Sequence, residues 1–319
     1  MSLAPRAVLV HRTSEYEELL ARHGTHGQAG FFLSSRGRAI EEPAARHLRA
    51  RRTLAEVAAA VPLNWRQARV ERADLDRFLF GPEDVVVVVG TDGLVANAAK
   101  YLSGQPVVGI DTEPGRGLGV LVRHRPEETA RLLAAAVSGS AVLDELTMVE
   151  AVADNTERIR ALNEIYLGRS GHQSARYRLT AGAGTGRGGP GADPGATEGA
   201  GRERTPVSET QASSGVLVGT GTGATGWLRS LWRERSSGLP LPGPADPRLL
   251  WFVREAWPSP ATGASLVAGV LERTDVLRLT VESDRLVAFG DGVESDALEL
   301  TWGQSIRLGV AETRLRLLI

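Results

Sequence analysis

The sequence predicts an α/β N-terminal domain with a doubly wound parallel sheet at residues 1–145, followed by a β-rich C-terminal domain at residues 146–319. Strand-like and helix-like segments alternate through the first part, which is the pattern of βαβ units. The five valines of Val85–Val89 have no polar face, as expected of a central parallel strand covered on both sides. The second part contains mainly short apolar runs separated by turn residues, which is typical of antiparallel sheets. A chain of 319 residues can form two domains of the usual size, about 100–200 residues each.

The first domain is expected to begin with a strand and a capped helix. Arg6–His11 (RAVLVH) is a short apolar run, and Ser14 stands three residues before Glu17, which is the spacing of a capping box. Glu42–Ala60 has apolar residues at helical spacing and a proline near its start, so we expect a helix there. Residues 68–75 (ARVERADL) alternate like a strand.

The next segments continue this alternation. The valine strand leads through a glycine-containing turn into a helix expected from about Val95 to Leu102. Pro106–Ile110 (PVVGI) is then expected to form another buried strand.

The second domain is predicted from runs of β-branched or alternating residues. They are LNEIYLG (162–168), ARYRLT (175–180), SGVLVGT (214–220), LLWFVRE (249–255), DVLRLTVES (275–283), RLVAF (285–289) and IRLGVA (306–311). One helix is expected at Trp227–Arg235. Residues 181–204 are rich in glycine and too poor in apolar side chains to offset their ordering entropy. Because β-type runs flank this segment, we expect a flexible insertion in a hairpin rather than a domain linker.

Composition excludes several classes of function. The formal net charge of −1 gives no reason to expect binding to nucleic acid or to an anionic membrane surface. The chain has no cysteine, so disulfides, thiolate metal sites and cysteine nucleophiles are excluded, and its six histidines show no metal-binding spacing. No signal peptide and no membrane span is expected, which predicts a cytoplasmic protein.

The turn Gly90-Thr91-Asp92-Gly93 lies where an open α/β sheet usually binds its ligand. The N–H groups at the start of the following helix suit a phosphate. An aspartate would repel phosphate, so Asp92 is better suited to accept a proton from a hydroxyl, or to hold that hydroxyl or a magnesium ion, during phosphoryl transfer. The alternative is that Asp92 only caps the helix, which stabilises it by about 0.5–2 kcal/mol. This stretch alone leaves both interpretations open.

A second glycine cluster follows a strand at residues 219–226. It contains a literal G-x-G-x-x-G, but a Rossmann loop requires an acidic residue on a second strand about twenty residues later. The chain instead reaches the proline-rich loop GLPLPGPADP (238–247), so we exclude a Rossmann loop. The local chemistry still suits a ligand, because Thr220, Thr222 and Thr225 supply hydroxyls and the glycines let a ligand approach the backbone.

Taken together, these segments resemble the NAD kinase family, and its mitochondrial-type branch more closely than the commoner bacterial form. GTDGL (90–94) stands where the family has GGDGT, and PVVGIDTEPGRGLGVL (106–121) carries the Thr-Asp/Glu-Pro step typical of that branch. Asn163 and Glu164 match the family's Asn-Glu pair, and SSGVLVGTGTGATGW (213–227) resembles its threonine- and glycine-rich turn. FVREAWPSP (252–260) and FGDGVE (289–294) resemble its later strand signatures.

The resemblance implies a two-domain fold with the active site in the cleft between the domains. It implies transfer of the γ-phosphoryl group of ATP, or of inorganic polyphosphate, to the 2′-hydroxyl of the adenosine ribose of NAD. Magnesium would bridge the donor phosphates, without a protein ligand that the sequence identifies. NAD and ATP are the expected partners, and a homodimer or higher homo-oligomer is expected.

The resemblance also assigns roles to individual residues. Asp92 would position or deprotonate the 2′-hydroxyl. The residues expected to contact the nucleotide are Gly93, Asn163, Glu164, Thr225, Gly226 and Ser230. The residues expected to contact phosphates are Gly90, Thr91, Thr220, Thr222 and Gly223.

The Asn163-Glu164 pair raises a question of geometry. Adjacent side chains of a strand point to opposite faces, so both can serve one ligand only near a strand end or a bulge. The alternative to a shared ligand is that Glu164 faces solvent and Asn163 caps a turn, as is common for an arbitrary Asn-Glu pair because both residue types are mostly exposed.

The chain also departs from the family pattern. Thr91 replaces a family glycine, Leu94 replaces the family threonine, and Asp111 replaces the usual asparagine and adds negative charge. These changes leave open a non-catalytic nucleotide sensor on the same fold, or a kinase with a changed donor or acceptor. A lipid kinase shares the glycine-aspartate-glycine turn but lacks the Asn-Glu and threonine-glycine segments. The sequence does not distinguish ATP from polyphosphate, or NAD from NADH.

Overall fold

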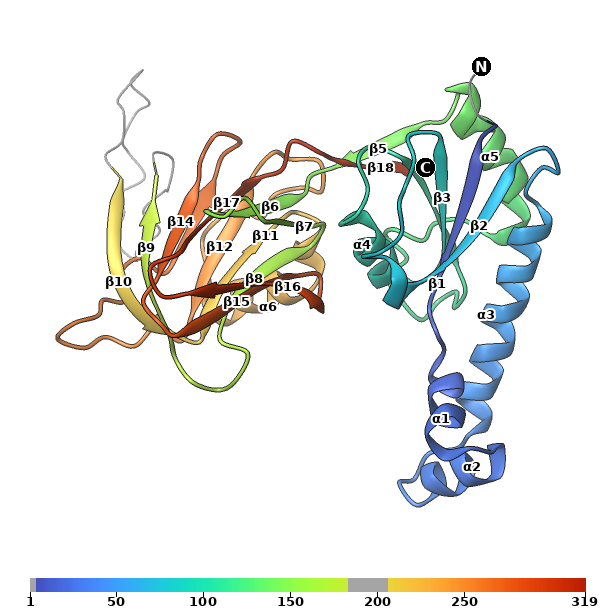
Figure 1. The fold of residues 1–319 in the computed structure, drawn as a ribbon, viewed down its shortest axis with the longest axis horizontal. Helices are drawn as coiled ribbons and strands as arrows, with labels where there is room; N and C mark the ends of the chain where they lie inside the picture. Colours follow the sequence, from blue (N-terminus) through green and yellow to red (C-terminus); the bar gives the residue numbers. More distant parts are fainter. Residues whose placement is uncertain (1–3, 183–205) are drawn as a thin grey trace. The chain divides into compact units, whose positions relative to one another are not determined.

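The computed structural model describes residues 4–182 and 206–319, and the chain divides into two compact units. Unit 1 contains the chain up to Asp144 together with Leu315–Ile319, and unit 2 contains Glu145–Arg314. From the sequence, the last residues of the chain are expected in the β-rich domain. The structure instead places them in unit 1, because strand β18 (Leu315–Leu318) pairs in parallel with strand β4 (Pro106–Asp111) and buries its leucines in that sheet (Figure 1).

Unit 1 is built on one six-stranded sheet with the order β2-β1-β3-β4-β18-β5. The remaining strands are β1 (Arg6–His11), β2 (Arg66–Glu71), β3 (Asp84–Gly90) and β5 (Leu143–Leu146). The pairs β1–β2, β1–β3, β3–β4 and β4–β18 are all parallel. The prediction of an α/β domain with a parallel sheet is therefore confirmed.

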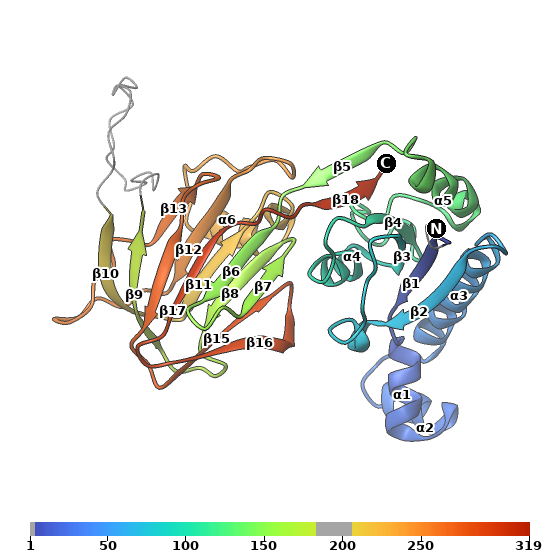
Figure 2. The ribbon, with the colours of Figure 1, turned by 45° about the horizontal axis from the view of Figure 1, so that its top comes forward.

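Helices cover both faces of this sheet. Helices α3 (Glu41–Ala59) and α5 (Thr129–Ser138) pack on one face, and α4 (Asp92–Ala99) lies on the other (Figure 2). The valines of β3 are buried along the whole strand, as the absence of a polar face predicts. Among the described residues, no helix has the combination of length and apolar composition that crossing a bilayer requires.

The segment between β1 and α3 forms two short helices. Helix α1 (Glu15–His23) begins at the predicted capping box, in which the Ser14 hydroxyl accepts from the Glu17 N–H and the Glu17 carboxylate accepts from the Ser14 N–H. Helix α2 (His26–Ser34) has no counterpart in the sequence analysis, and it packs against α1 through a small apolar cluster.

Two predicted boundaries of unit 1 are wrong. The strand expected at 68–75 ends at Glu71, because the Glu71 side chain accepts from the Ala73 N–H and starts a 3-10 turn, η1 (Arg72–Asp74). The helix expected from Val95 begins at Asp92, with Thr91 in the extended conformation of an N-cap residue. Asp92 therefore lies in the first turn of α4.

Unit 2 consists of two six-stranded sheets that share one apolar core. The first has the order β10-β9-β14-β17-β6-β7 and contains β6 (Val149–Ala153), β7 (Arg158–Ala161), β9 (Ala175–Ala181), β10 (Val207–Ser213), β14 (Leu277–Val281) and β17 (Ser305–Val310). The second has the order β13-β12-β11-β8-β15-β16 and contains β8 (Glu164–Gly168), β11 (Gly215–Gly219), β12 (Leu249–Arg254), β13 (Ala268–Leu271), β15 (Arg285–Gly290) and β16 (Val293–Thr301). All pairings between these strands are antiparallel.

One helix, α6 (Trp227–Glu234), packs its leucines on the outer face of the second sheet, against Tyr166, Leu217 and Phe252. The insertion predicted at 181–204 begins too early, because Ala181 belongs to β9; from residue 183 to 205 it lies outside the described residues. The strands on either side of it, β9 and β10, pair antiparallel with Ala181 opposite Val207.

Candidate functional site

The carboxyl ends of β1 and β3 flank the topological switch point of the unit 1 sheet. The chain leaves β1 through α1–α3 to reach β2 on one side, and it leaves β3 through α4 to reach β4 on the other side. Open α/β sheets bind their ligands in the crevice at this point. The turn Gly90-Thr91 and the first turn of α4 lie there, as the sequence analysis expected.

The Asp92 carboxylate is half-buried and holds a neighbouring loop. Its Oδ1 accepts from the N–H groups of Leu121 (2.8 Å) and Val122 (3.0 Å), and its Oδ2 accepts from the N–H of Val120 (3.1 Å). A carboxylate has about four acceptor positions, so these three bonds leave one open on Oδ2. Asp92 is thus not the cap of α4, whose N-cap residue is Thr91; its carboxylate fixes the loop and can still accept one hydrogen bond from a hydroxyl.

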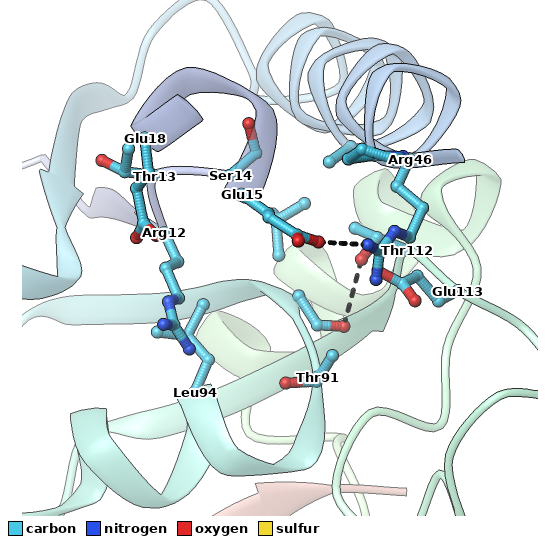
Figure 3. A pocket seen from close by; sticks show the side chains of 14 residues that line it. Arg12, Thr13, Ser14, Glu15, Glu18, Arg46, Thr91, Leu94, Thr112 and Glu113 are labelled. Atoms are coloured by element: carbon cyan, nitrogen blue, oxygen red, sulfur yellow. Dashed lines mark hydrogen bonds and ion pairs between the residues drawn. The ribbon is translucent and has the colours of Figure 1, made fainter. Parts of the chain in front are cut away.

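Two cavities meet at this turn. The larger, of about 280 Å³, is lined by the residues that follow β1, by the end of β3 and by α3; Figure 3 shows it from close by. The smaller, of about 170 Å³, is lined by Asp92, Asp111, Arg116 and the loop around Gly119. Thr91 and Glu113 line both cavities. A ligand group at this shared wall would therefore lie beside Asp92.

The departures from the family pattern at this turn do not distort it. Thr91 has a φ of −119°, which any residue adopts, so the conformation of the turn does not require glycine there. Leu94 is buried and packs over Gly90, where an added Cβ would lie 2.8 Å from the Leu94 Cδ2. Leu94 thus replaces a hydroxyl with an apolar wall of the larger cavity.

The threonine-glycine turn of unit 2 connects β11 to α6 and is held by Thr220. Thr220 is buried, its hydroxyl donates to the Leu162 carbonyl, and the same oxygen accepts from the N–H groups of Thr222 (3.1 Å) and Gly223 (3.2 Å). These bonds use the hydroxyl within the protein, so Thr220 shapes the turn. Thr222 is also buried, and within the described part of the chain its hydroxyl has no hydrogen-bond partner.

The far side of the turn is open to solvent. Thr225 and Gly226 are exposed, and they lie within the 3-10 turn η3 (Gly223–Thr225) and at the N-cap of α6. Ser230 is exposed on the first turns of α6, where its hydroxyl lies 3.5 Å from the Gly226 carbonyl. These three residues are thus exposed to solvent, and the Thr225 hydroxyl donates to the Thr222 carbonyl (2.9 Å); their contact with an adenosine stays a prediction.

Gly223 brings the turn against Asn163. A Cβ at Gly223 would lie 2.3 Å from the Asn163 carbonyl oxygen, a backbone atom that cannot move aside. We expect Gly223→Ala to destabilise the chain by about 2–4 kcal/mol, because overpacking against backbone forces the turn apart. Gly238→Ala is the matched control, since a Cβ there meets nothing within 4 Å, and its unfolding midpoint in urea should match the unmodified chain. Equal midpoints for both variants would contradict this account of the turn.

Asn163 and Glu164 stand at a strand end. Asn163 precedes β8 and Glu164 is its first residue, so the geometric condition for both to serve one ligand is met. The Thr220 N–H donates to the Asn163 carbonyl (2.9 Å), and Glu164 pairs with Gly219 beside α6. The structure therefore brings the Asn-Glu pair and the threonine-glycine turn together within unit 2.

Asp291 fixes this strand end, and it is not among the site residues predicted from the sequence. Its carboxylate accepts from three consecutive N–H groups, those of Leu162 (2.7 Å), Asn163 (2.8 Å) and Glu164 (3.3 Å), and its own N–H donates to the Glu164 carbonyl. Asp291 has a φ of +52° in the two-residue turn between β15 and β16. The Asp-Gly step after an apolar strand is a strong hairpin signal that predicts this turn.

Glu164 is a half-buried carboxyl group with an altered pKa. Burial raises its pKa from 4.5 to about 8, and the nearby charge of Asp291 adds to the increase. At neutral pH the Glu164 carboxyl is thus largely protonated in the free chain, and it can donate a hydrogen bond to a ligand.

This pKa predicts how stability depends on pH. The folded chain holds a proton on Glu164 up to about pH 8, whereas the unfolded chain loses it near pH 4.5. The stabilising contribution is therefore complete below pH 4.5 and is lost as the pH rises through 8. Relative to Glu164→Gln, the free energy of unfolding should fall by about 1–3 kcal/mol across this window, allowing for partial exposure. The exposed Glu294→Gln is the control, and a flat difference between the unmodified chain and Glu164→Gln would overturn the assignment.

Comparisons with known proteins support the fold. No protein-family profile matches the chain, and the search of curated proteins finds no match. Among solved structures, the chain is similar to an NAD kinase from Archaeoglobus fulgidus in complex with ATP, with 17% sequence identity and a TM-score of 0.52. The similarity covers 98% of this chain and 93% of that one. The chain therefore has the two-domain fold of an NAD kinase.

Proposed function

We propose that this protein phosphorylates the 2′-hydroxyl of the adenosine ribose of NAD to give NADP, with ATP as the donor, and that it belongs to the mitochondrial-type branch of NAD kinases. The observation that carries the proposal is the half-buried Asp92 carboxylate at the switch point, with an acceptor position left open beside two cavities. The NAD kinase fold supports it.

Asp92 would accept the hydrogen bond of the 2′-hydroxyl and orient its oxygen toward the γ-phosphorus of ATP. A bond forms between the 2′-oxygen and the γ-phosphorus, and the bond from that phosphorus to the bridging oxygen of ADP breaks. The hydroxyl proton passes to Asp92 and then to solvent, and ADP leaves. The three backbone N–H groups that hold Asp92 fix its position before the substrate binds.

Unit 2 would bind the acceptor nucleotide through its strand end and its turn. Asn163 and Glu164 would hydrogen-bond the base and ribose, and the exposed Thr225, Gly226 and Ser230 would contact the adenosine. The buried Thr222 hydroxyl, which has no partner among the described residues, would contact a phosphate, whereas the Gly223 N–H donates to Thr220 and both residues shape the turn. In unit 1, Gly90, Thr91 and Gly93 would lie beside the transferred phosphoryl group.

Magnesium fits this site only as a partner of the donor phosphates. Within the described part of the chain, no group of three histidine or carboxylate side chains is arranged to hold a metal ion. Magnesium commonly binds through substrate phosphates, water and one or two carboxylates, and Asp111 in the smaller cavity would supply one such oxygen. When bound, the ion would neutralise charge on the phosphates during transfer.

A steady-state assay tests the proposal. The purified chain is incubated with NAD or NADH, magnesium, and either ATP or polyphosphate, and NADP or NADPH is measured with an NADP-specific dehydrogenase. The proposal predicts NADP formation with NAD and ATP. Absence of NADP and NADPH under every combination would refute it.

A second candidate is a nucleotide sensor without turnover. It is favoured by the three hydrogen bonds that the Asp92 carboxylate accepts from the N–H groups of residues 120–122, since this structural role explains the aspartate without catalysis. The sensor would be stabilised by NAD or ATP in thermal unfolding while forming no NADP. Homo-oligomerisation and a cytoplasmic location stay predictions of the sequence.

A further inference from the structure

A cavity of about 540 Å³ lies in unit 2, at the end of β8 opposite to Asn163 and Glu164. It is lined by the loop after β8, by the start of β9, by the turn after β14 and by the turn between β16 and β17. Glu164 begins β8 and Arg169 follows its end, so a strand length of about 17 Å separates this cavity from the proposed acceptor residues. The proposed function therefore does not use it.

Hydrogen bonds within the protein fix the walls of this cavity. The buried Ser283 hydroxyl accepts from the Arg176 N–H (2.8 Å) and donates to the Arg176 carbonyl (3.1 Å). The Gly303 N–H donates to the Val281 carbonyl (2.9 Å) and so holds the turn that carries Trp302 against the end of β14. The backbone positions of Arg176 and Trp302 are thus set without a ligand.

The lining contains an unpaired cation but no unpaired carboxylate. The Arg176 side chain is exposed, and it has no hydrogen-bond or ion-pair partner among the described residues. The Glu282 carboxylate accepts from Arg178 at 3.2 Å, and the Asp284 carboxylate lies 3.9 Å from the guanidinium of Arg169. An arginine without a partner in a concave site suits a phosphate, which it binds with two parallel hydrogen bonds.

The sheet that leads into this cavity carries more arginines than carboxylates on its solvent face, where they alternate with residues of the shared core. Arg278 stands directly opposite Arg307 on β14 and β17, although like charges at opposed positions are destabilising. This surplus of positive charge attracts an anion to the end of the sheet. In the part of the chain that the structure describes, the arginines of this face are Arg158, Arg160, Arg176, Arg178, Arg278 and Arg307, and the carboxylates on it or at its margin are those of Glu150, Asp154 and Glu282.

The cavity also has an aromatic wall. Trp302 lies in the turn between β16 and β17 and is 68% exposed, so its indole presents a flat surface on which an aromatic ring can stack. One unpaired arginine neutralises one phosphate, and further phosphates would lie near Glu282 and Asp284 without a cation of their own. The lining therefore favours a ligand with one phosphate and a flat ring.

We propose that this cavity binds a nucleoside monophosphate, with its phosphate on Arg176 and its base stacked on Trp302. The site is separate from the proposed catalytic site, and its occupation does not require phosphoryl transfer.

Fluorine NMR of the full chain labelled with 5-fluorotryptophan tests this proposal, with the Trp302 resonance assigned by its absence in Trp302→Ala. AMP or UMP should shift this resonance saturably, whereas inorganic phosphate and adenosine should do so only at concentrations at least about tenfold higher, since each provides one of the two contacts. Arg176→Ala should weaken binding of the monophosphate about 10–100-fold, and Arg176→Lys should recover part of the affinity. The control Arg273→Ala removes an exposed arginine of unit 2 that does not line this cavity, and it should bind like the unmodified chain.

The outcomes decide each part of the proposal. A Trp302 resonance that neither monophosphate moves, or equal affinities in Arg176→Ala and the unmodified chain, would overturn the site. Inorganic phosphate that binds as tightly as AMP and UMP would show an anion site without a base contact and would also overturn it. Arg176→Ala should form NADP with the kcat and the KM for NAD of the unmodified chain, whereas a raised KM for NAD would assign this cavity to the acceptor and overturn its independence.

Discussion

Asp92→Asn is expected to lower the kcat for NADP formation by about 10²–10⁴-fold, which is the usual contribution of a positioned general base. The amide cannot take the hydroxyl proton, and one of its two oxygen positions becomes an N–H₂ donor that faces the backbone N–H groups of the Val120–Val122 loop. The KM for NAD should change much less than kcat, because the lost interaction is made mainly in the transition state.

Two measurements separate this chemical role of Asp92 from its structural role. Thermal unfolding of Asp92→Asn reports the loss of loop contacts, and ATP binding by calorimetry reports whether the variant still binds the donor. Asp76→Asn, an exposed aspartate of the same unit that lines neither cavity, should keep the activity of the unmodified chain. If folded Asp92→Asn retains more than about a tenth of kcat, Asp92 is not the base.

Asp291→Ala is expected to have the largest effect on acceptor binding in unit 2. It leaves the N–H groups of Leu162, Asn163 and Glu164 without their acceptor, and it places alanine at a φ of +52°. We expect a loss of about 2–4 kcal/mol in the free energy of unfolding and an increase of about tenfold or more in the KM for NAD. The KM for ATP should stay nearly constant.

Asp291→Asn is the conservative variant to compare with Asp291→Ala. Asparagine tolerates the same backbone conformation and keeps one carbonyl oxygen, so it should recover part of the stability and of the NAD affinity. Asp284→Ala, at an aspartate of unit 2 whose side chain is 96% exposed, should behave like the unmodified chain. An unchanged KM for NAD in Asp291→Ala would show that this aspartate does not position the nucleotide site.

Local sequence patterns predict the strands and helices that are determined by residues close together in the chain. The valine run predicted a strand buried on both faces, and the Ser14–Glu17 spacing predicted the start of α1. Both follow from periodicity and capping, which depend on residues close in the chain. The placement of Asn163 and Glu164 at a strand end also agrees with the requirement that one ligand contact both.

The parts that the sequence did not predict depend on contacts between distant residues. Strand β18 joins the sheet of unit 1 across more than 200 residues, since Leu317 pairs with Val107. Asp291 accepts from the Asn163 N–H across a sequence separation of 128 positions, and no residue near either one in the sequence predicts this contact. For Asp92 the sequence leaves two roles open, a helix cap and a catalytic carboxylate. In the structure its carboxylate also accepts from the N–H groups of Leu121 and Val122, and local sequence patterns do not predict this role in holding a distant loop.

The position of the new phosphate tests the account most directly. The chain is incubated with NAD, ATP and magnesium, and the product is analysed by tandem mass spectrometry and ³¹P NMR, with an NAD analogue that lacks the 2′-hydroxyl of the adenosine ribose as a parallel acceptor. The account predicts NADP phosphorylated at that 2′-oxygen, together with ADP, and no product from the analogue. Phosphorylation at another oxygen, or ATP consumption without phosphorylated NAD, would contradict it.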